Sequence, residues 1–130
     1  MFVRILLVGF VACLAGIIFS VDSGSRPEVW EDVYAIPFVD KIGHLVLMGM
    51  FSFLANLSLH CRSIRVLDRR IMIGTLVVLA IVVMEEFSQA FIATRHCDAA
   101  DLVADVIGIV LGAAAAKPCQ RLRLRRAQIG

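Results

Sequence analysis

The sequence predicts an all-α integral membrane protein with four transmembrane helices, a fold class indicated by composition and by hydropathy pattern. Hydrophobic residues make up 60% of the 130-residue chain, and its mean hydropathy is +0.88. Both values are well above those of ordinary water-soluble domains. Apolar stretches suited to spanning helices lie at about residues 3–20, 41–59, 71–91 and 98–116. A chain of this length is expected to form one domain, residues 1–130.

Positive charges are divided unequally between the segments that join these stretches. The first connection is mainly acidic, and the third has Arg95 as its only arginine or lysine. The positive-inside rule therefore places both termini and the second connection in the cytoplasm, as in a multi-pass protein of the inner (cytoplasmic) membrane. Two termini on one side require an even number of spans, which four satisfies. The basic residues on that side are Arg4, Arg62, Arg65, Arg69, Arg70, Lys117, Arg121, Arg123, Arg125 and Arg126.

The first two stretches are long enough to span the membrane. Residues 3–20 are too long for the apolar region of a typical signal peptide and lack an A-x-A cleavage site, so a retained helix is expected. Cleavage there would leave the topology of the other spans unchanged. The second stretch, 41–59, follows Asp40, whose side chain is expected to cap the helix N-terminus.

The third and fourth stretches are too short to span without including carboxylates. Their apolar runs cover residues 71–84 and 102–116, whereas a helix rising about 1.5 Å per residue must cross a core of about 30 Å. The third helix must therefore extend to Glu86, and the fourth must begin near Asp101. Ionisable groups inside a membrane are costly and by default indicate a functional site.

Three of these polar residues are predicted to lie at one level. Counted from the cytoplasmic end of each span, His44, Glu86 and Asp101 each lie about 22 to 23 Å up, near the outer boundary. Gln89 shares the helical face of Glu86. The sequence therefore predicts a polar site that opens outward from three helices.

One face of the last helix combines acidic and small residues. Its upper half is acidic, and its lower half is the Gly-x-x-x-Gly pattern that lets two helices touch backbone to backbone. These residues fall within an arc of about 80°, so this face is expected to be turned into the bundle. Gly9 and Gly16 of the first span are the candidate opposing surface. The residues of the face are Asp98, Asp101, Asp105, Gly108 and Gly112.

The combined spacing resembles that of the VanZ-like membrane proteins, over about residues 36–112. The resemblance implies a small helical membrane protein of the bacterial cell envelope, from a family whose namesake is linked to resistance to the glycopeptide teicoplanin. The family typically has Asn where this chain has Asp105, so no role is transferred to that position. The pattern reads Asp40-Lys41-x-x-His44, Glu86-x-x-Gln89 and Arg95-x-x-Asp98-x-x-Asp101-x-x-x-Asp105-x-x-Gly108-x-x-x-Gly112.

Three functions remain open for this polar site. The first is to engage a lipid-linked cell-wall precursor or shield it from glycopeptides, and the second is an intramembrane hydrolase or phosphatase acting on such a lipid. The third is a structural scaffold whose polar groups only fix helix packing. The candidate catalytic residues are His44, Glu86 and Asp101, and the candidate ligand-binding residues are Asp40, Lys41, Gln89, Arg95, Asp98 and Asp105.

The chemistry of these side chains suits a phosphorylated lipid. Arg95 and Lys41 would hold phosphate, with Arg offering two parallel hydrogen bonds, while His44 or Glu86 would act as general base. Membrane lipid is the expected partner, nucleic acid is not, and neither a cofactor nor a metal site is predicted. A divalent cation on His44, Glu86 and the carboxylates of the last helix is the weakest alternative, because no compact metal motif supports it.

Overall fold

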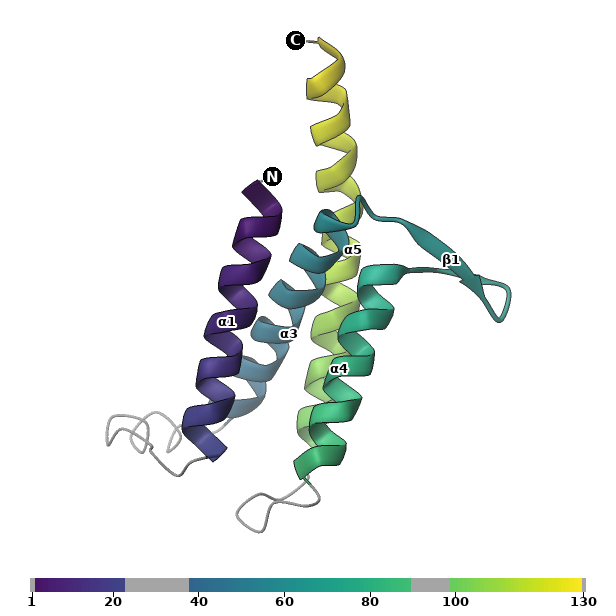
Figure 1. The fold of residues 1–130 in the computed structure, drawn as a ribbon. Helices are drawn as coiled ribbons and strands as arrows, with labels where there is room; N and C mark the ends of the chain where they lie inside the picture. The colour runs from purple at the N-terminus through teal and green to yellow at the C-terminus, as the bar shows by residue number, and fades with distance from the viewer. Residues whose placement is uncertain (1, 23–37, 90–98, 130) are drawn as a thin grey trace.

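The computed structural model describes residues 2–22, 38–89 and 99–129 and arranges them as four helices and one β-hairpin (Figure 1). Successive helices run antiparallel. The start of α1, the hairpin and the end of α5 therefore lie at one end of the bundle, here called the terminal end. The starts of α3 and α5 and the end of α4 lie at the other, here called the site end. The elements are α1 (Phe2–Asp22), α3 (Val39–Ser58), β1 (Ser63–Val66), β2 (Arg69–Met72), α4 (Ile73–Gln89) and α5 (Ala99–Ile129).

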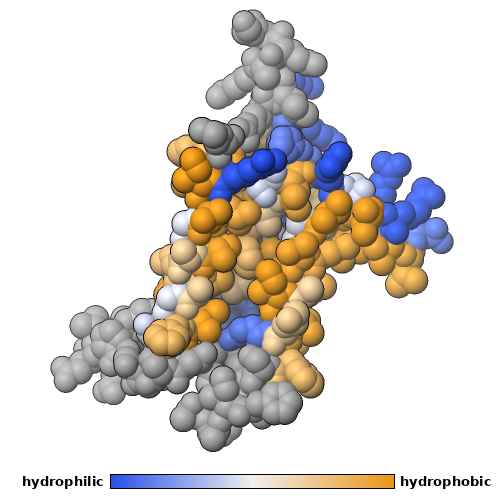
Figure 2. All heavy atoms as spheres, in the orientation of Figure 1, coloured by the Kyte–Doolittle hydropathy of each residue, from blue (hydrophilic) through white to orange (hydrophobic). Residues whose placement is uncertain are grey.

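Three of the described helices are long and apolar enough to cross a membrane. They are Phe2–Ser20, Val39–Ser58 and Ala99–Leu122, whereas the apolar part of α4 is the shorter Ile73–Glu85. Figure 2 shows mostly hydrophobic side chains over the flank of the helices, with hydrophilic ones toward the two ends. The chain is thus a helical membrane protein. A fourth span and the orientation of the two ends stay predictions.

The third helix begins later than the sequence predicts. Ile71 and Met72 belong to strand β2 and not to α4, because Ile71 pairs with Ile64 across an antiparallel hairpin. The backbone N–H of Ile73 donates to the carbonyl oxygen of Arg62 at 2.9 Å and closes the hairpin where the helix starts. The segment expected to be a plain cytoplasmic connection is therefore a two-stranded hairpin. The predicted end of this span, residue 91, lies outside the described residues.

The last helix is longer than predicted. It does not end at Ala116 but continues past Pro118 to Ile129. Proline removes one backbone donor, yet most of the residues after it are leucines, arginines, alanine and glutamines, which are among the stronger helix formers. The basic tail is therefore a helical extension of the span. The predicted start of the last span, residue 98, lies outside the described residues.

The predicted cap of α3 is wrong. The N-cap residue is Phe38, with a left-handed φ of 67° and no side-chain cap hydrogen bond. Asp40 lies instead in the first turn of the helix, where the helix dipole favours a negative charge. The carboxylate of Asp40 is thus not used for capping and is free to contribute to the site end.

Glycines bring α3 and α5 into close contact. A Cβ atom on Gly112 would collide with the carbonyl oxygen of Gly49, and one on Gly108 would collide with the backbone of α3. The glycine face of the last helix is therefore turned into the bundle, as predicted. The prediction of the opposing surface is wrong, however. That surface is Gly49 of α3, whereas a Cβ on Gly9 or Gly16 would meet nothing within 4 Å.

Two fully buried polar side chains of α3 link it to the neighbouring helices. The Ser52 hydroxyl donates to the carbonyl oxygen of Ile109 in α5 at 2.9 Å. The Asn56 amide donates to the Thr75 hydroxyl at 3.0 Å, and its oxygen accepts the Thr75 backbone N–H at 3.2 Å. Asn56 therefore caps the first turn of α4 from another helix and fixes where α4 begins.

Replacing Asn56 is expected to destabilise the bundle. Asn56→Ala leaves the Thr75 N–H and hydroxyl without this partner in an apolar interior, which should lower the free energy of unfolding by about 2 to 3 kcal/mol. Ser58→Ala is the matched control, because the buried Ser58 hydroxyl donates only within its own helix, to Ala55 at 2.9 Å. Thermal unfolding in detergent, followed by circular dichroism, measures both variants. Equal losses would argue against an interhelical role for Asn56.

Candidate functional site

Five ionisable side chains from α3 and α5 gather at the site end. Those of α3 lie in its first two turns, and those of α5 lie one turn apart near its start, so spacings of three and four residues place each set on one helical face. We call this group the polar cluster. Its members are Asp40, Lys41, His44, Asp101 and Asp105.

Lys41 and Asp101 form the first ion pair of the polar cluster. The Lys41 Nζ donates to Asp101 Oδ1 at 2.7 Å. The Lys41 side chain is 33% exposed and that of Asp101 is 18% exposed, so both groups can be reached from the site end. A hydrogen bond between two charged groups at this distance is among the stronger polar contacts in proteins.

His44 and Asp105 form the second pair, deeper in the bundle. His44 Nδ1 lies 3.0 Å from Asp105 Oδ1, and the Asp105 side chain is only 5% exposed. A buried carboxylate on one ring nitrogen fixes the orientation of the imidazole and directs the other nitrogen elsewhere. That second nitrogen, Nε2, lies 4.0 Å from the Asp40 carboxylate. The arrangement can hold His44 as a proton acceptor facing the more exposed part of the cluster.

The polar cluster also includes three groups close enough to hold a metal ion. Asp40, His44 and Asp101 each offer one ligand atom, and these atoms lie within 4.8 Å of one another. Carboxylate oxygens and imidazole suit several divalent cations. The Lys41 ammonium already occupies the Asp101 carboxylate at 2.7 Å and would compete with such an ion. The cation therefore remains the weaker reading of this geometry.

The structure does not describe the side chains of the other candidate residues. Glu86 and Gln89 belong to the last turns of α4, which end at the site end, but their side chains are outside what the structure describes. Arg95 and Asp98 lie outside the described residues. Convergence of the third helix on the polar cluster, and every catalytic or binding role, stays a prediction.

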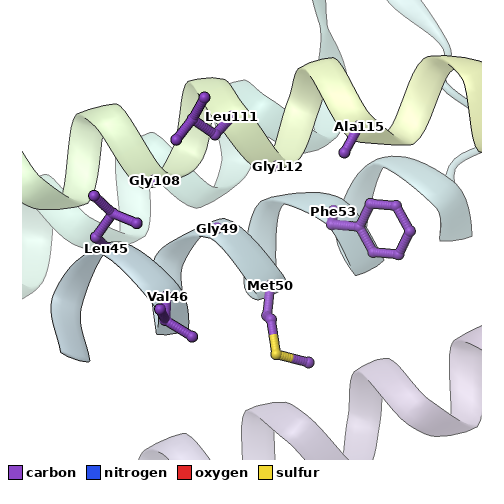
Figure 3. A pocket seen from close by; sticks show the side chains of 9 residues that line it. All are labelled: Leu45, Val46, Gly49, Met50, Phe53, Gly108, Leu111, Gly112 and Ala115. Atoms are coloured by element: carbon purple, nitrogen blue, oxygen red, sulfur yellow. The ribbon is translucent and has the colours of Figure 1, made fainter. Parts of the chain in front are cut away.

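An apolar groove begins beside the polar cluster and follows the contact between α3 and α5 (Figure 3). It has a volume of about 280 Å³ and is lined by residues of these two helices alone. Gly49 and Gly112, which bring the two helices into contact, are among its lining residues. The groove starts at Leu45, the residue after His44. Its lining consists of Leu45, Val46, Gly49, Met50, Phe53, Gly108, Leu111, Gly112 and Ala115.

Sequence reasoning missed Gly49 and the groove. The two glycines of α3, Gly43 and Gly49, are six residues apart and form no Gly-x-x-x-Gly pattern, and half-exposed apolar residues such as Val46 and Met50 resemble any lipid-facing surface. The contact of His44 with Asp105, rather than with Asp101, was also not anticipated. A signal for it exists, because Asp101 and Asp105 are four residues apart and share a face.

Comparison with known proteins gives one family match. The family model described as VanZ/LLP1 matches residues 5–122. This extends on both sides of the motif region at about 36–112. No curated protein and no solved structure matches the chain.

Proposed function

Because the chain belongs to the VanZ/LLP1 family, we propose that it is a cell-envelope membrane protein that engages the head group of a lipid-linked cell-wall precursor at the polar cluster. The observation that carries the proposal is the contact of Lys41 with Asp101, next to that of His44 with Asp105. Charged groups from two helices are held together at one end of an apolar bundle, a placement that is costly without a function.

The groove between α3 and α5 supports a lipid as the ligand. A polar head group at Lys41 would place an attached hydrocarbon chain at Leu45, one helical turn further along α3, where the groove begins. An apolar hollow next to a small set of converging polar groups is the usual form of a binding site. The site thus offers the two chemistries that an amphipathic lipid requires.

The positive-inside rule assigns this site to the outer face of the membrane. The basic residues of the hairpin and of the α5 extension lie at the terminal end, so that end would face the cytoplasm. A precursor engaged from the outer face is the one a glycopeptide would reach. Engaging or shielding it there would account for the family's link with glycopeptide resistance.

One observation favours a second function, hydrolysis of the bound lipid. The buried Asp105 carboxylate orients His44 through Nδ1 and leaves Nε2 beside the more exposed Asp40, at 4.0 Å. An imidazole oriented in this way can accept a proton from water as the water oxygen attacks the terminal phosphorus of a polyprenyl pyrophosphate. The bond from that phosphorus to the bridging oxygen breaks, so that inorganic phosphate is released and polyprenyl phosphate is the leaving group. The rival is therefore an intramembrane phosphatase with His44 as general base and Lys41 on the phosphate.

Lipids that co-purify with the protein test the binding proposal. Mass spectrometry of wild-type protein is expected to find a polyprenyl-phosphate lipid enriched over bulk phospholipid. Lys41→Gln should reduce that lipid about tenfold or more, since a charge-assisted hydrogen bond contributes about 1.5 to 3 kcal/mol. Lys117→Gln changes an exposed lysine in the α5 extension and should leave the lipid unchanged.

Two further variants distinguish lipid binding from lipid hydrolysis and from a purely structural role. Release of phosphate from a polyprenyl pyrophosphate by wild type, but not by His44→Gln or Asp101→Asn at equal protein levels, would establish the hydrolase. Retained lipid without phosphate release would leave the binding function. If no lipid is selectively retained and the variants only lower the melting temperature, the polar cluster is a scaffold and the proposal is wrong.

A further inference from the structure

One face of the β-hairpin at the terminal end carries two arginines opposite each other, and the other face carries three apolar residues and Arg69. Residues directly opposite each other in an antiparallel pair point to the same side of the sheet, and neighbours along a strand point to opposite sides. The register pairs Arg65 with Arg70 and Ile64 with Ile71. The two arginines therefore share one face of the hairpin, and the two isoleucines share the other.

Two arginines opposite each other are unfavourable on their own. Like charges directly across a strand pair weaken the pairing. Arg65 and Arg70 are both exposed, and among the described residues no carboxylate forms a salt bridge with either. An anion held between the two guanidinium groups would replace this repulsion with attraction. The guanidinium group presents paired donors that fit a phosphate.

The tip of the hairpin carries an exposed leucine beside Asp68, at a position where a turn is usually polar. Leu67 is 94% exposed and, like Asp68, has a left-handed backbone, with φ of 46° and 61°. Two-residue turns of this kind favour Asn-Gly, because a bulky side chain is strained at positive φ. A leucine here is unfavourable in water, since transfer of its side chain into an apolar medium is favourable.

The hairpin is placed where a membrane surface would meet it. It projects sideways from the bundle at the level where α4 begins (Figure 1). Figure 2 shows hydrophobic atoms on the side of this projection that faces along the apolar flank of the helices, and hydrophilic atoms at its outer edge. A bilayer around the helices would therefore reach the apolar side of the hairpin and leave the arginines at head-group level.

We propose that this hairpin is an anionic-phospholipid site on the membrane surface of the terminal end. Arg65 and Arg70 hold a lipid phosphate between them, while Ile64 and Leu67 insert among the acyl chains. The site is separate from the polar cluster, which lies at the opposite end of the bundle. A bound protein would be the other possible cover, but a lipid is favoured because the hairpin carries both basic and apolar side chains beside the apolar flank of the helices.

Lipid binding to the full-length protein tests the arginine pair. Delipidated protein in neutral detergent is titrated with phosphatidylglycerol or phosphatidylcholine, and bound lipid is counted by native mass spectrometry. Wild type is expected to prefer phosphatidylglycerol. Arg65→Gln/Arg70→Gln should weaken that binding roughly tenfold or more, since each basic residue near an anionic surface contributes about 1 kcal/mol.

A matched pair of arginines controls for general basicity. Arg121→Gln/Arg125→Gln removes two exposed arginines of α5 at the same end and should weaken binding far less. Equal losses in the two double variants would overturn the hairpin site, because the attraction would then belong to the whole basic surface. Equal binding of the two lipids by wild type would overturn it as well.

A tryptophan at the tip measures the depth of insertion. Leu67→Trp is made with Trp30→Phe, which removes the only other tryptophan of the chain. In bilayers of brominated phosphatidylglycerol, its fluorescence is expected to be blue-shifted and strongly quenched. An unquenched, water-like emission would place the tip in solution, indicate a protein partner instead, and contradict the proposal.

Discussion

Gly112→Ala is expected to abolish most of the folded protein, whereas Gly16→Ala should be tolerated and slightly stabilising. A methyl group on Gly112 would collide with the Gly49 carbonyl oxygen in α3. Because the obstacle is backbone, it can be relieved only by separating the two helices, at a cost of about 3 kcal/mol or more. The same change at Gly16 meets nothing within 4 Å and gains helix propensity of about 1 kcal/mol.

Melting temperature and yield in detergent measure this difference. The same change, glycine to alanine, is expected to destabilise the protein at residue 112 and to stabilise it slightly at residue 16. The pair of variants therefore tests which glycines lie at the helix interface. If Gly112→Ala melts at the wild-type temperature, then α3 and α5 do not touch through their backbones. The polar cluster would then lose its positioning as well, since Lys41 reaches Asp101 only because the two helices are this close.

The glycine contact shows how far sequence patterning reaches. The face of the last helix was predictable, because acidic and small residues share one arc and neither belongs toward lipid. Its partner was not predictable from the same rule. Gly9 and Gly16 have a regular spacing but no contact, and Gly49 has the contact without any spacing signal. A pattern on one helix fixes which face is buried, whereas the choice of neighbour depends on tertiary packing.

Counting residues along the helices put His44 and Asp101 at one level, whereas the contact of His44 in the structure is with Asp105. Measured from the predicted ends at residues 59 and 116, His44 stands level with Asp101. In the structure Lys41 contacts Asp101 and His44 contacts Asp105, with sequence separations of 60 and 61. The error is about one helical turn. It arises because α3 ends at Ser58 in a defined cap while α5 continues past its predicted end.

The hairpin could not have been predicted with the same confidence as the helices. Its strands are Ser63–Val66 and Arg69–Met72, too short for a clear alternation, and its turn lacks the usual Asn-Gly signal. The apolar residues at the end of β2, Ile71 and Met72, are followed directly by those of α4. In the sequence the two sets together resemble one continuous helix. What decides the boundary is the bond from Ile73 to Arg62, a contact that local propensity does not encode.

The pair of His44 and Asp105 supplies the second large effect. His44→Leu is expected to lower the free energy of unfolding by about 3 to 5 kcal/mol, because it leaves the buried Asp105 carboxylate without its partner. The double variant His44→Leu/Asp105→Leu should recover most of this loss, since well-packed apolar groups often replace a buried ion pair at little cost. Reversible unfolding in mixed detergent, applied to the wild type, both single variants and the double variant, measures the coupling.

The double variant also separates stability from function. If the polar cluster binds or transforms a lipid, the restored protein should be folded and abundant but should retain no polyprenyl-phosphate lipid, because the imidazole and its buried carboxylate are gone. If the pair serves only to fix helix packing, lipid retention or any resistance phenotype should return together with stability. Failure of the double variant to recover would instead show that His44 and Asp105 stabilise the bundle separately. If the polar cluster is a functional site, the double variant should recover stability but not lipid retention, which is the outcome we expect.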